Sequence, residues 1–188
     1  MNKLTIIGSG FSAGVFSRSI NDKDIIIFDK SRGPGGRSST RRAENIGAFD
    51  HGLQFISPKE KKFELFLNNY LNSFIKQWDG DHICFEESRK IEGKKYIGKS
   101  GNNDFVKNLI NTKVYYQKEL ISIKKIKDFW LLDFKDGTKN ECEKLVLTIP
   151  LEQCKKLTET EQLDLKFEGV MEPNLTTMVA FDKNLKIS

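Results

Sequence analysis

Histidine and cysteine are scarce in this sequence of 188 residues. The two histidines are too few for a multi-histidine metal centre, so we expect no metal site. Cys84, Cys142 and Cys154 are widely spaced and form no CxxC pair, which argues against a zinc ribbon and a disulfide framework. Reduced thiols in a cytoplasmic protein fit this pattern.

A long hydrophobic run is also missing. The charge-free stretch Leu4–Ser17 has 14 residues and is interrupted by a Gly-Ser-Gly triplet. A membrane-spanning helix needs about 20 apolar residues. A signal peptide needs a basic start and a cleavage site, which this stretch does not offer. We therefore expect a cytoplasmic protein with no membrane partner.

Charge of one sign does not dominate the chain. The net charge is +5, and the lysines are scattered and accompanied by acids, as in "KDGTKNECEK". This mixture is typical of a solvated surface, and no RNA- or DNA-binding motif accompanies it, so we expect no nucleic-acid partner. The apolar share of 38%, with 14 phenylalanines, is enough for the core of one domain or slightly more.

Arginine is rare but clustered. It occurs six times, and four of the six lie in "FDKSRGPGGRSSTRR" at positions 28–42, together with three glycines. A planar guanidinium can donate two parallel hydrogen bonds to a phosphate, which an ammonium group cannot do. The stretch therefore predicts a phosphate-binding loop that contains Arg37 and suits an extended flavin dinucleotide. A flexible basic loop in solvent is the alternative.

The N-terminal segment has the pattern of a βαβ unit. Strands are predicted at Leu4–Ile7 and Ile25–Asp29, with a helix at Ser12–Ile20 between them. The turn GxGxxA at residues 8–13 would place a pyrophosphate at the helix N-terminus. This pattern is weak by itself, because a glycine turn without a nucleotide also joins strands to helices.

Asp29 strengthens the nucleotide interpretation. It lies nineteen residues beyond Gly10, where an acid commonly accepts hydrogen bonds from the adenosine ribose. A carboxylate there also repels a 2′-phosphate, so the cofactor should lack one. The alternative is an ordinary exposed carboxylate at the end of a strand.

The rest of the chain predicts a helix over residues 57–78 and then an antiparallel meander. Ser57 as N-cap, Pro58 and Glu60 form a capping box, and an apolar stripe that follows them is typical of a core-facing helix. The other predicted elements are strands at 94–98, 120–126, 129–134, 144–150 and 176–182 and helices at 103–110 and 151–157.

Three stretches together resemble the renalase-like branch of the flavin amine oxidase superfamily. They are "LTIIGSGFSAG", "IIIFDKSRGPGGRSSTRR" and "FDHGLQF". The resemblance implies an NAD(P)/FAD-dependent oxidoreductase of the α/β class. The expected fold is a Rossmann-type FAD-binding βαβ domain with an antiparallel β-meander and the start of a substrate domain.

The predicted division of the chain has four parts. These are the first part of the FAD-binding Rossmann core at 1–56, a helical substrate-side insertion at 57–98, a return to the FAD-binding domain with the meander at 99–160, and the start of a substrate domain at 161–188. Members of the family continue well beyond the last residue of this sequence, so we expect a fragment or a truncated reading frame.

The resemblance also implies a role for individual residues. The pyrophosphate turn is implied for Gly8, Gly10, Phe11 and Ser12, and the ribose contacts for Asp29 and Lys30. Contacts to the phosphate and the flavin tail are implied for Gly36 and Arg37, and contacts to the isoalloxazine ring for Gly52, Leu53 and Gln54. A backbone contact to adenine is implied for Leu120. For His51, a hydrogen-bonded structural role is favoured over a place beside the flavin.

The predicted activity is hydride transfer from a small amine or a dihydronicotinamide-like substrate to flavin N5, with a small-molecule substrate and possibly NAD(P)H as partners. The flavin carries the difficult chemistry, so an acid–base constellation in the protein is not required, and no catalytic residue is assigned. A nicotinamide-only Rossmann dehydrogenase and a truncated, non-catalytic flavin-binding remnant remain alternatives.

Overall fold

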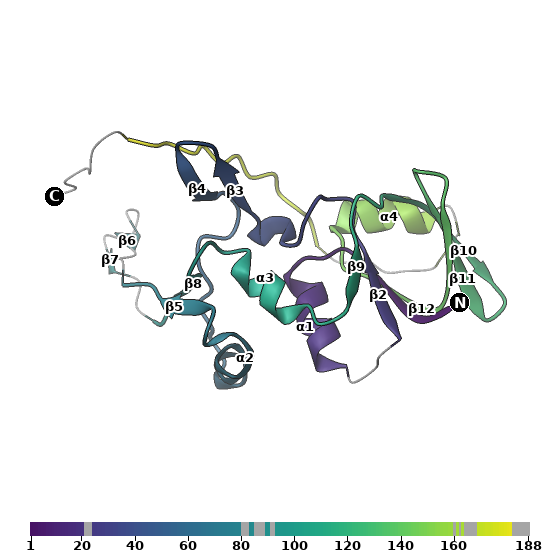
Figure 1. The fold of residues 1–188 in the computed structure, drawn as a ribbon, viewed down its shortest axis with the longest axis horizontal. Helices are drawn as coiled ribbons and strands as arrows, with labels where there is room; N and C mark the ends of the chain where they lie inside the picture. Colours follow the sequence, from purple (N-terminus) through teal and green to yellow (C-terminus); the bar gives the residue numbers. More distant parts are fainter. Residues whose placement is uncertain are drawn as a thin grey trace.

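The computed structural model of the protein describes residues 1–20, 24–79, 83–84, 89–90, 93–159, 161, 163 and 169–181. Its largest described sheet has six strands and lies in the right-hand part of Figure 1. The strand order is β10-β11-β12-β1-β2-β9, in which β12, β1, β2 and β9 are parallel. Their bounds are β1 Asn2–Ile7, β2 Ile25–Phe28, β9 Lys113–Tyr115, β10 Leu120–Ile126, β11 Phe129–Phe134 and β12 Lys139–Leu147. The predicted α/β class, with its parallel sheet and antiparallel meander, is confirmed.

The βαβ unit forms as the sequence predicts. Helix α1 spans Phe11–Ser19 and joins β1 to β2, which pair in parallel with Ile6 beside Ile27. Strand β2 is a continuous apolar run, and residues Leu4–Ile7 of β1 are all buried, because a parallel strand in the middle of a sheet is covered on both faces.

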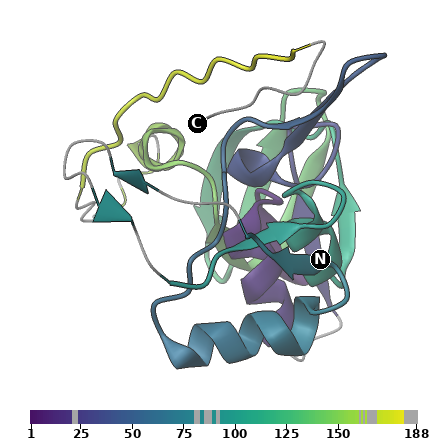
Figure 2. The ribbon, with the colours of Figure 1, turned by 90° about the vertical axis from the view of Figure 1, so that its left-hand side faces the viewer.

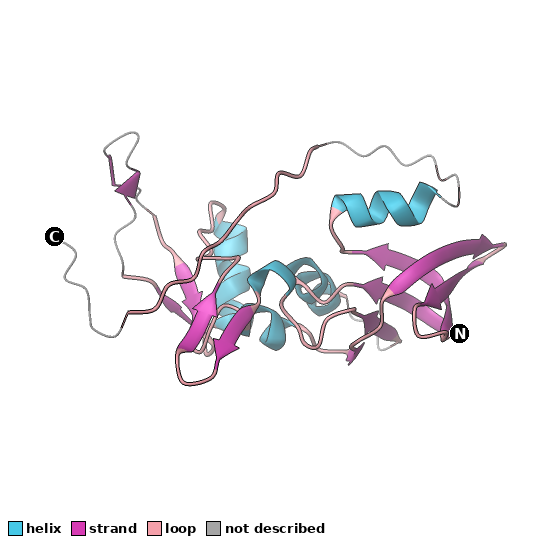
Figure 3. Cartoon of the chain, turned by 90° about the horizontal axis from the view of Figure 1, so that it is seen from above, coloured by secondary structure: helices cyan, strands magenta, loops and turns pink. Residues whose placement is uncertain are grey.

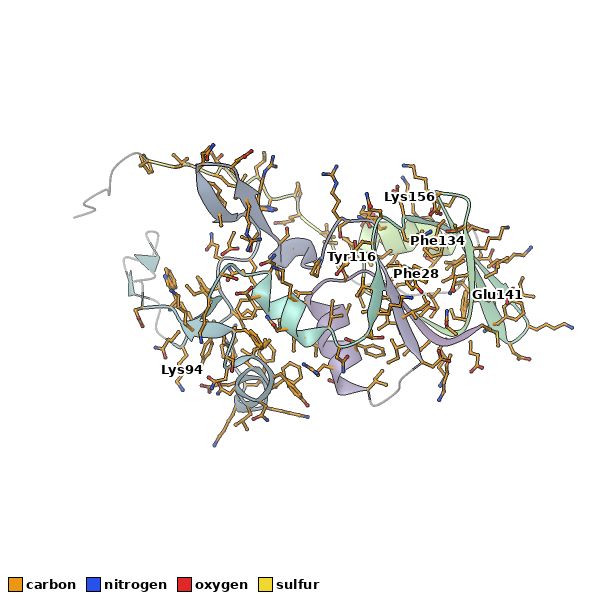
Figure 4. The ribbon with its side chains drawn as sticks, in the orientation of Figure 1. Phe28, Lys94, Tyr116, Phe134, Glu141 and Lys156 are labelled. Atoms are coloured by element: carbon orange, nitrogen blue, oxygen red, sulfur yellow. The ribbon has the colours of Figure 1, made fainter. Side chains whose placement is uncertain are left out.

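The alternation of side chains along β1 and β2 divides the core into two layers. Ile6 and Ile27 point to one face and pack with Ala13 of α1. Ile7 and Phe28 point to the other face, where Phe28 meets Phe134 of the meander at a ring-centroid distance of 4.6 Å (Figure 4). The parallel strands thus pack on α1 with one face, and on the other face their side chains cluster with Phe134 of β11, a strand of the same sheet, and with Leu157. Helix α4, Leu151–Glu159, contacts β10 on the meander side (Figure 3).

A second group of elements extends from the α1 side. Its cluster of buried residues includes Leu67, Leu71, Ile75 and Phe105. The elements are η1 Gly36–Ser38, β3 Thr40–Ala43, β4 Gly47–Asp50, α2 Lys61–Leu71, β5 Ile75–Gln77, β6 Ile83–Cys84, β7 Arg89–Lys90, β8 Tyr96–Gly98 and α3 Asp104–Leu109. Figure 2 shows α2 and the C-terminal segment at opposite sides of this part of the molecule.

The predicted helix over 57–78 is wrong at both ends. Helix α2 begins after Glu60, no side-chain hydrogen bond caps it, and the Ser57 hydroxyl donates instead to the Lys94 carbonyl at 3.2 Å. The reason is a long-range contact: Ile56 pairs with Tyr96 through two backbone hydrogen bonds, which hold the chain extended up to the proline. The helix ends at Leu71, and Ile75 belongs to strand β5.

Two further expectations are corrected. The apolar stripe is only partly core, because Tyr70 and Phe74 are 41% and 42% exposed. The strand predicted at 176–182 does not form over 176–181, where the chain is exposed and has no strand partner among the described residues (Figure 2); Asp182 lies outside those residues. No described helix has both the length and the apolar character that a membrane crossing requires.

Candidate functional site

The first glycine turn is shaped by its contact with the end of β12. Gly8 has a φ of +100°, and a Cβ at this position would lie 2.8 Å from Thr148 Oγ1. Its N–H donates to the Phe28 carbonyl at 2.8 Å, which ties the turn to β2 as well. A residue with a side chain would be strained here and would also collide with its neighbour.

Beyond this turn, the N-terminus of α1 is open. Gly10 is the N-cap, no side chain caps the helix, and its first turn contains no acid. The first N–H groups of a helix have no partner within the helix and carry the positive end of its dipole. A Cβ on Gly10 would meet nothing within 4 Å, so these amides can be approached closely by a ligand.

In a turn of the GxGxxG or GxGxxA type, the small third residue allows the helix to pack closely on the sheet. In this protein the close packing is divided between Ala13 and Gly14. Ala13 is fully buried against the sheet. A Cβ on Gly14 would lie 3.0 Å from Leu109 Cβ, so Gly14 allows α1 to pack closely on α3. The absence of a glycine at position 13 therefore does not disturb the turn.

The second glycine turn lies directly against the first. Gly35 and Gly36 have φ values of +135° and +54°, and a Cβ on Gly35 would lie 2.9 Å from Ser39 Cα. The Gly35 N–H donates to the Ser9 carbonyl at 3.1 Å. A Cβ on Gly36 would lie 3.4 Å from Gly10 Cα, so the two turns approach backbone to backbone.

Arg37 follows these glycines with its guanidinium exposed and without a hydrogen bond or ion pair to any described residue. Its carbonyl accepts a hydrogen bond from Leu53 N–H at 2.9 Å. A Cβ on Gly52 would lie 2.1 Å from the same carbonyl oxygen, so only glycine fits there. Gly52 and Leu53 thus support the backbone of Arg37 and leave its side chain available.

Asp29 joins the two turns. Its Oδ2 accepts the N–H and the hydroxyl of Ser9, the latter at 2.7 Å. Its Oδ1 accepts the N–H of Ser31 at 2.7 Å and the Ser31 hydroxyl. Burial raises the pKa of Asp29, but the hydrogen bonds from Ser31 and Ser9 outweigh it, and the pKa falls below its usual value. The residue is only 9% exposed.

These elements surround one cavity of about 770 Å³. Nine of the twelve predicted site residues line it, namely Gly8, Gly10, Phe11, Ser12, Asp29, Lys30, Gly36, Arg37 and Leu120. Gly52, Leu53 and Gln54 do not line it; Gly52 and Leu53 contact the backbone of Arg37 instead. The structure thus brings both glycine turns and Arg37 to one cavity, while the ligand contacts assigned to them remain predictions.

Sequence reasoning missed the opposite wall of the cavity. It consists of residues that follow β9 and β12, among them Lys118, Glu119, Thr148, Gln153 and Lys156. The sequence did carry a signal for part of this wall, the apolar strand predicted at 144–150. If this strand joins the sheet parallel to β1, its carboxyl end lies beside that of β1. The carboxyl ends of parallel strands meet at one edge, where ligands of α/β folds bind.

Sequence reasoning also missed a buried polar hub at Asn102. Its side chain is 1% exposed, and its Nδ2 donates to the carbonyls of Leu53 and Gln54 at 2.6 and 2.9 Å. Its Oδ1 accepts the Gly98 N–H at 2.9 Å. Asn102 therefore positions the 52–54 segment. His51 is hydrogen-bonded as expected, with Nε2 3.2 Å from the Ser39 hydroxyl.

Apart from Asp29, whose carboxylate is hydrogen-bonded to two serines, the charged side chains at the cavity that have no ion pair among the described residues are positive. Lys118 forms an ion pair with Asp136, which is the main cause of the lowering of the Asp136 pKa to about 2. Glu119 pairs with Lys135 at 3.0 Å. Lys30, Arg37 and Lys156 make no hydrogen bond or ion pair to the described residues; Lys156 is labelled in Figure 4. Open amides and unpaired cations suit a phosphate-bearing ligand.

Comparisons with known proteins show a domain match and a shared fold. Residues 6–70 match the family described as NAD(P)-binding Rossmann-like domain. The fold is similar to the solved structure of a protein assigned as a protoporphyrinogen oxidase from Exiguobacterium sp. 255-15. The TM-score is 0.61 at 11% identity, over 84% of this chain and 61% of that one.

Two other solved structures share the fold. A CLA-producing fatty acid isomerase from P. acnes has a TM-score of 0.63 at 10% identity, over 87% of this chain and 62% of that chain. The tetracycline destructase Tet(51) has a TM-score of 0.52 at 14% identity, over 84% and 41%. This chain therefore spans less than two thirds of the length of each structure.

Proposed function

We propose that the cavity binds FAD and that the chain is the dinucleotide-binding part of a flavin-dependent oxidoreductase. The reaction would transfer a hydride from a small amine or a dihydronicotinamide-like substrate to flavin N5, as the renalase-like motifs imply. The observation that supports this proposal best is the meeting of the two glycine turns at one cavity, with the Gly35 N–H bonded to the Ser9 carbonyl.

The residues of the cavity suit the parts of FAD. The open amides at Phe11 and Ser12 would bind one side of the diphosphate, and the Arg37 guanidinium would bind the other with two parallel hydrogen bonds. The backbone of Leu120 would meet the adenine. A cavity of about 770 Å³ is large enough to enclose a substantial part of such a ligand.

When bound, the flavin supplies the redox chemistry, and the protein contributes binding and orientation. Asn102 fixes the carbonyls of Leu53 and Gln54, and Gly52 allows this segment to contact the Arg37 backbone. The segment is therefore held rigidly next to the second turn, where the isoalloxazine contacts are proposed. Hydrogen bonding by Gln54 would orient the ring.

A nicotinamide-only dehydrogenase is the second candidate. It is favoured by the family match, whose description is NAD(P)-binding. It explains the Gly8–Gly14 turn but gives the unpaired Arg37 no ligand. A non-catalytic flavin-binding chain is also compatible with the length, because the matched structures are longer than this chain.

Titration of the full 188-residue chain with FAD, NAD⁺ and NADP⁺ tests the proposal. We expect FAD to bind and to give the chain the visible absorbance of an oxidised flavin. Arg37→Lys should weaken FAD binding about tenfold through the loss of a charge-assisted hydrogen bond. Arg41→Lys, the same change on the exposed β3 strand away from the cavity, should not alter binding. Binding of NAD⁺ without FAD would favour the dehydrogenase.

A further inference from the structure

We propose that Glu119, rather than Asp29, is the carboxylate that accepts hydrogen bonds from the adenosine ribose hydroxyls, and that Asp29 fastens the two glycine turns together. This inference rests on the proposed function, because it assumes that an adenine dinucleotide occupies the cavity. It replaces the ribose role that the sequence pattern gave to Asp29.

The oxygens of Asp29 are already occupied. An ionised carboxylate offers about four acceptor positions. Ser9 and Ser31 supply four donors to them, namely two backbone N–H groups and two hydroxyls. The Ser31 hydroxyl has one proton to donate, and its contact with Asp29 Oδ1, at 2.5 Å, is shorter than its alternative contact with the Gly33 carbonyl, at 2.7 Å. A ribose hydroxyl would have to displace one of these donors.

Displacing a donor from Asp29 would disturb the cavity itself. The Ser9 N–H is buried within the first turn, and the Ser9 carbonyl accepts the Gly35 N–H of the second turn. Without the carboxylate, the buried Ser9 N–H would lose its partner, which is unfavourable. The geometry therefore suits a structural clamp between the turns better than an exchangeable ligand contact.

Glu119 lies in the same cavity with an acceptor to spare. Its Oε2 pairs with Lys135 at 3.0 Å, and its Oε1 has no hydrogen bond to the described residues. Its side chain is 44% exposed, so a ligand in the cavity can reach it. The Lys135 contact lowers the pKa of Glu119, so the group is an ionised acceptor at neutral pH.

The position of Glu119 along the chain suits a ribose contact. The Lys118 N–H donates to the Asp29 carbonyl at 2.8 Å, so residues 118–119 run beside the end of β2. Leu120, the predicted adenine contact, follows immediately and lines the cavity. A ribose between adenine and the diphosphate would therefore face Glu119. Its negative charge would disfavour a 2′-phosphate, which predicts FAD or NAD⁺ over NADP⁺.

The experiment compares ADP with 2′-deoxy-ADP, which lacks one ribose hydroxyl, by calorimetry on the full chain. The wild type should bind ADP about tenfold more tightly, as expected for a hydrogen bond to a charged acceptor. In Glu119→Gln the ratio should fall toward one. In Lys135→Gln, which removes the ion pair but retains Glu119, the ratio should persist.

The variant Asp29→Asn tests the structural role proposed for Asp29. It should weaken both ligands to a similar extent, because it loosens the turns, and leave their ratio unchanged. If Asp29→Asn does not fold, Ser31→Ala, which removes one donor from the clamp, replaces it with the same expectation. A ratio that survives Glu119→Gln, or that Asp29→Asn abolishes, overturns this inference alone. No binding of ADP or FAD by the folded wild type overturns the proposed function and, with it, this inference.

Discussion

The two glycine turns meet at the same cavity but obtain their shapes differently. The first turn, Gly8–Gly14, is fixed by its neighbours in the βαβ unit and by Thr148 at the end of β12. The second turn, Gly33–Gly36, depends on a chain of distant contacts. The carbonyl of Arg37 is held by Gly52 and Leu53, and Asn102 holds Leu53 in turn.

This difference in support means that some substitutions should change the stability of the fold and others mainly the binding of a ligand. The first turn begins at Gly8, which β2 and Thr148 hold, and only its far end at Gly14 packs on α3. Its start should therefore keep its shape when the second group of elements is disturbed. The second turn presents an unpaired cation on support that comes from the segment before α2 and from the start of α3. Substitutions in that support should therefore displace Arg37 even though the substituted residues do not touch the ligand.

Gly52→Ala should have the largest effect. Its Cβ would lie 2.1 Å from the Arg37 carbonyl oxygen, so the backbone of the second turn must move. We expect the free energy of unfolding to fall by about 3 kcal/mol, at the upper end for overpacking. Urea denaturation measures it. Gly33→Ala, where a Cβ meets nothing within 4 Å, is the control. Equal stability of the two variants would contradict the support described for Arg37.

Asn102→Ala should follow. It removes three hydrogen bonds and leaves the Leu53 and Gln54 carbonyls and the Gly98 N–H without this partner. A loss of about 2 kcal/mol in the free energy of unfolding is expected, together with weaker FAD binding. Asn68→Ala, on the exposed side of α2, should change neither quantity. If Asn102→Ala retains full FAD affinity, the second turn does not depend on this hub.

Gly10→Ser should act on binding alone. Serine is a favoured N-cap, and the space around Gly10 Cα is open, so the free energy of unfolding should stay constant or rise by about 0.5 kcal/mol. Its side chain would occupy the approach to the α1 amides, and FAD affinity should fall by about tenfold or more, about 1.4 kcal/mol. Gly33→Ser is the matched control, since Gly33 does not line the cavity. Unchanged affinity in Gly10→Ser would mean that the diphosphate lies elsewhere.

The smallest expected effect is the change with pH in the stability that Asp29 contributes. Burial raises the pKa of Asp29, but the hydrogen bonds from Ser31 and Ser9 lower it by more, so the pKa lies below its usual value. The stability that Asp29 contributes is therefore present above the unfolded pKa of about 3.9 and is lost as the pH falls through the folded pKa. Denaturation curves at several pH values should show the difference between wild type and Asp29→Asn narrowing below about pH 4. A constant difference would contradict this linkage.

The parts of the fold that the sequence predicts are those determined by neighbouring residues. The β1–α1–β2 unit, the Asp29 position and the meander hairpins follow from local apolar patterns and turns. The start of α2 does not, because the distant Tyr96 strand holds Ile56 extended. Residues 176–181 have an apolar pattern but pair with no strand in the part of the chain that the structure describes, so the pattern alone does not form a sheet.

The same distinction applies to the site. Gly8, Gly10, Gly36 and Arg37 can be recognised because a turn requires glycine and a phosphate favours arginine. Glu119, Lys156 and Asn102 carry no such pattern; they reach the cavity or its support only when β9, β12 and α3 take their places. The hydrogen bonds to the Asp29 carboxylate also come from Ser9 in the first turn and from Ser31 just before the second. No spacing rule specifies these serines.

An NMR titration of the ¹⁵N-labelled chain with ADP, using adenosine as the control, tests most directly whether one diphosphate touches both turns. We predict that ADP shifts the amide signals of Phe11 and Ser12 and the Arg37 Nε–H signal together, with one dissociation constant, whereas adenosine shifts none of the three. A response to ADP confined to one of the two turns would contradict the account.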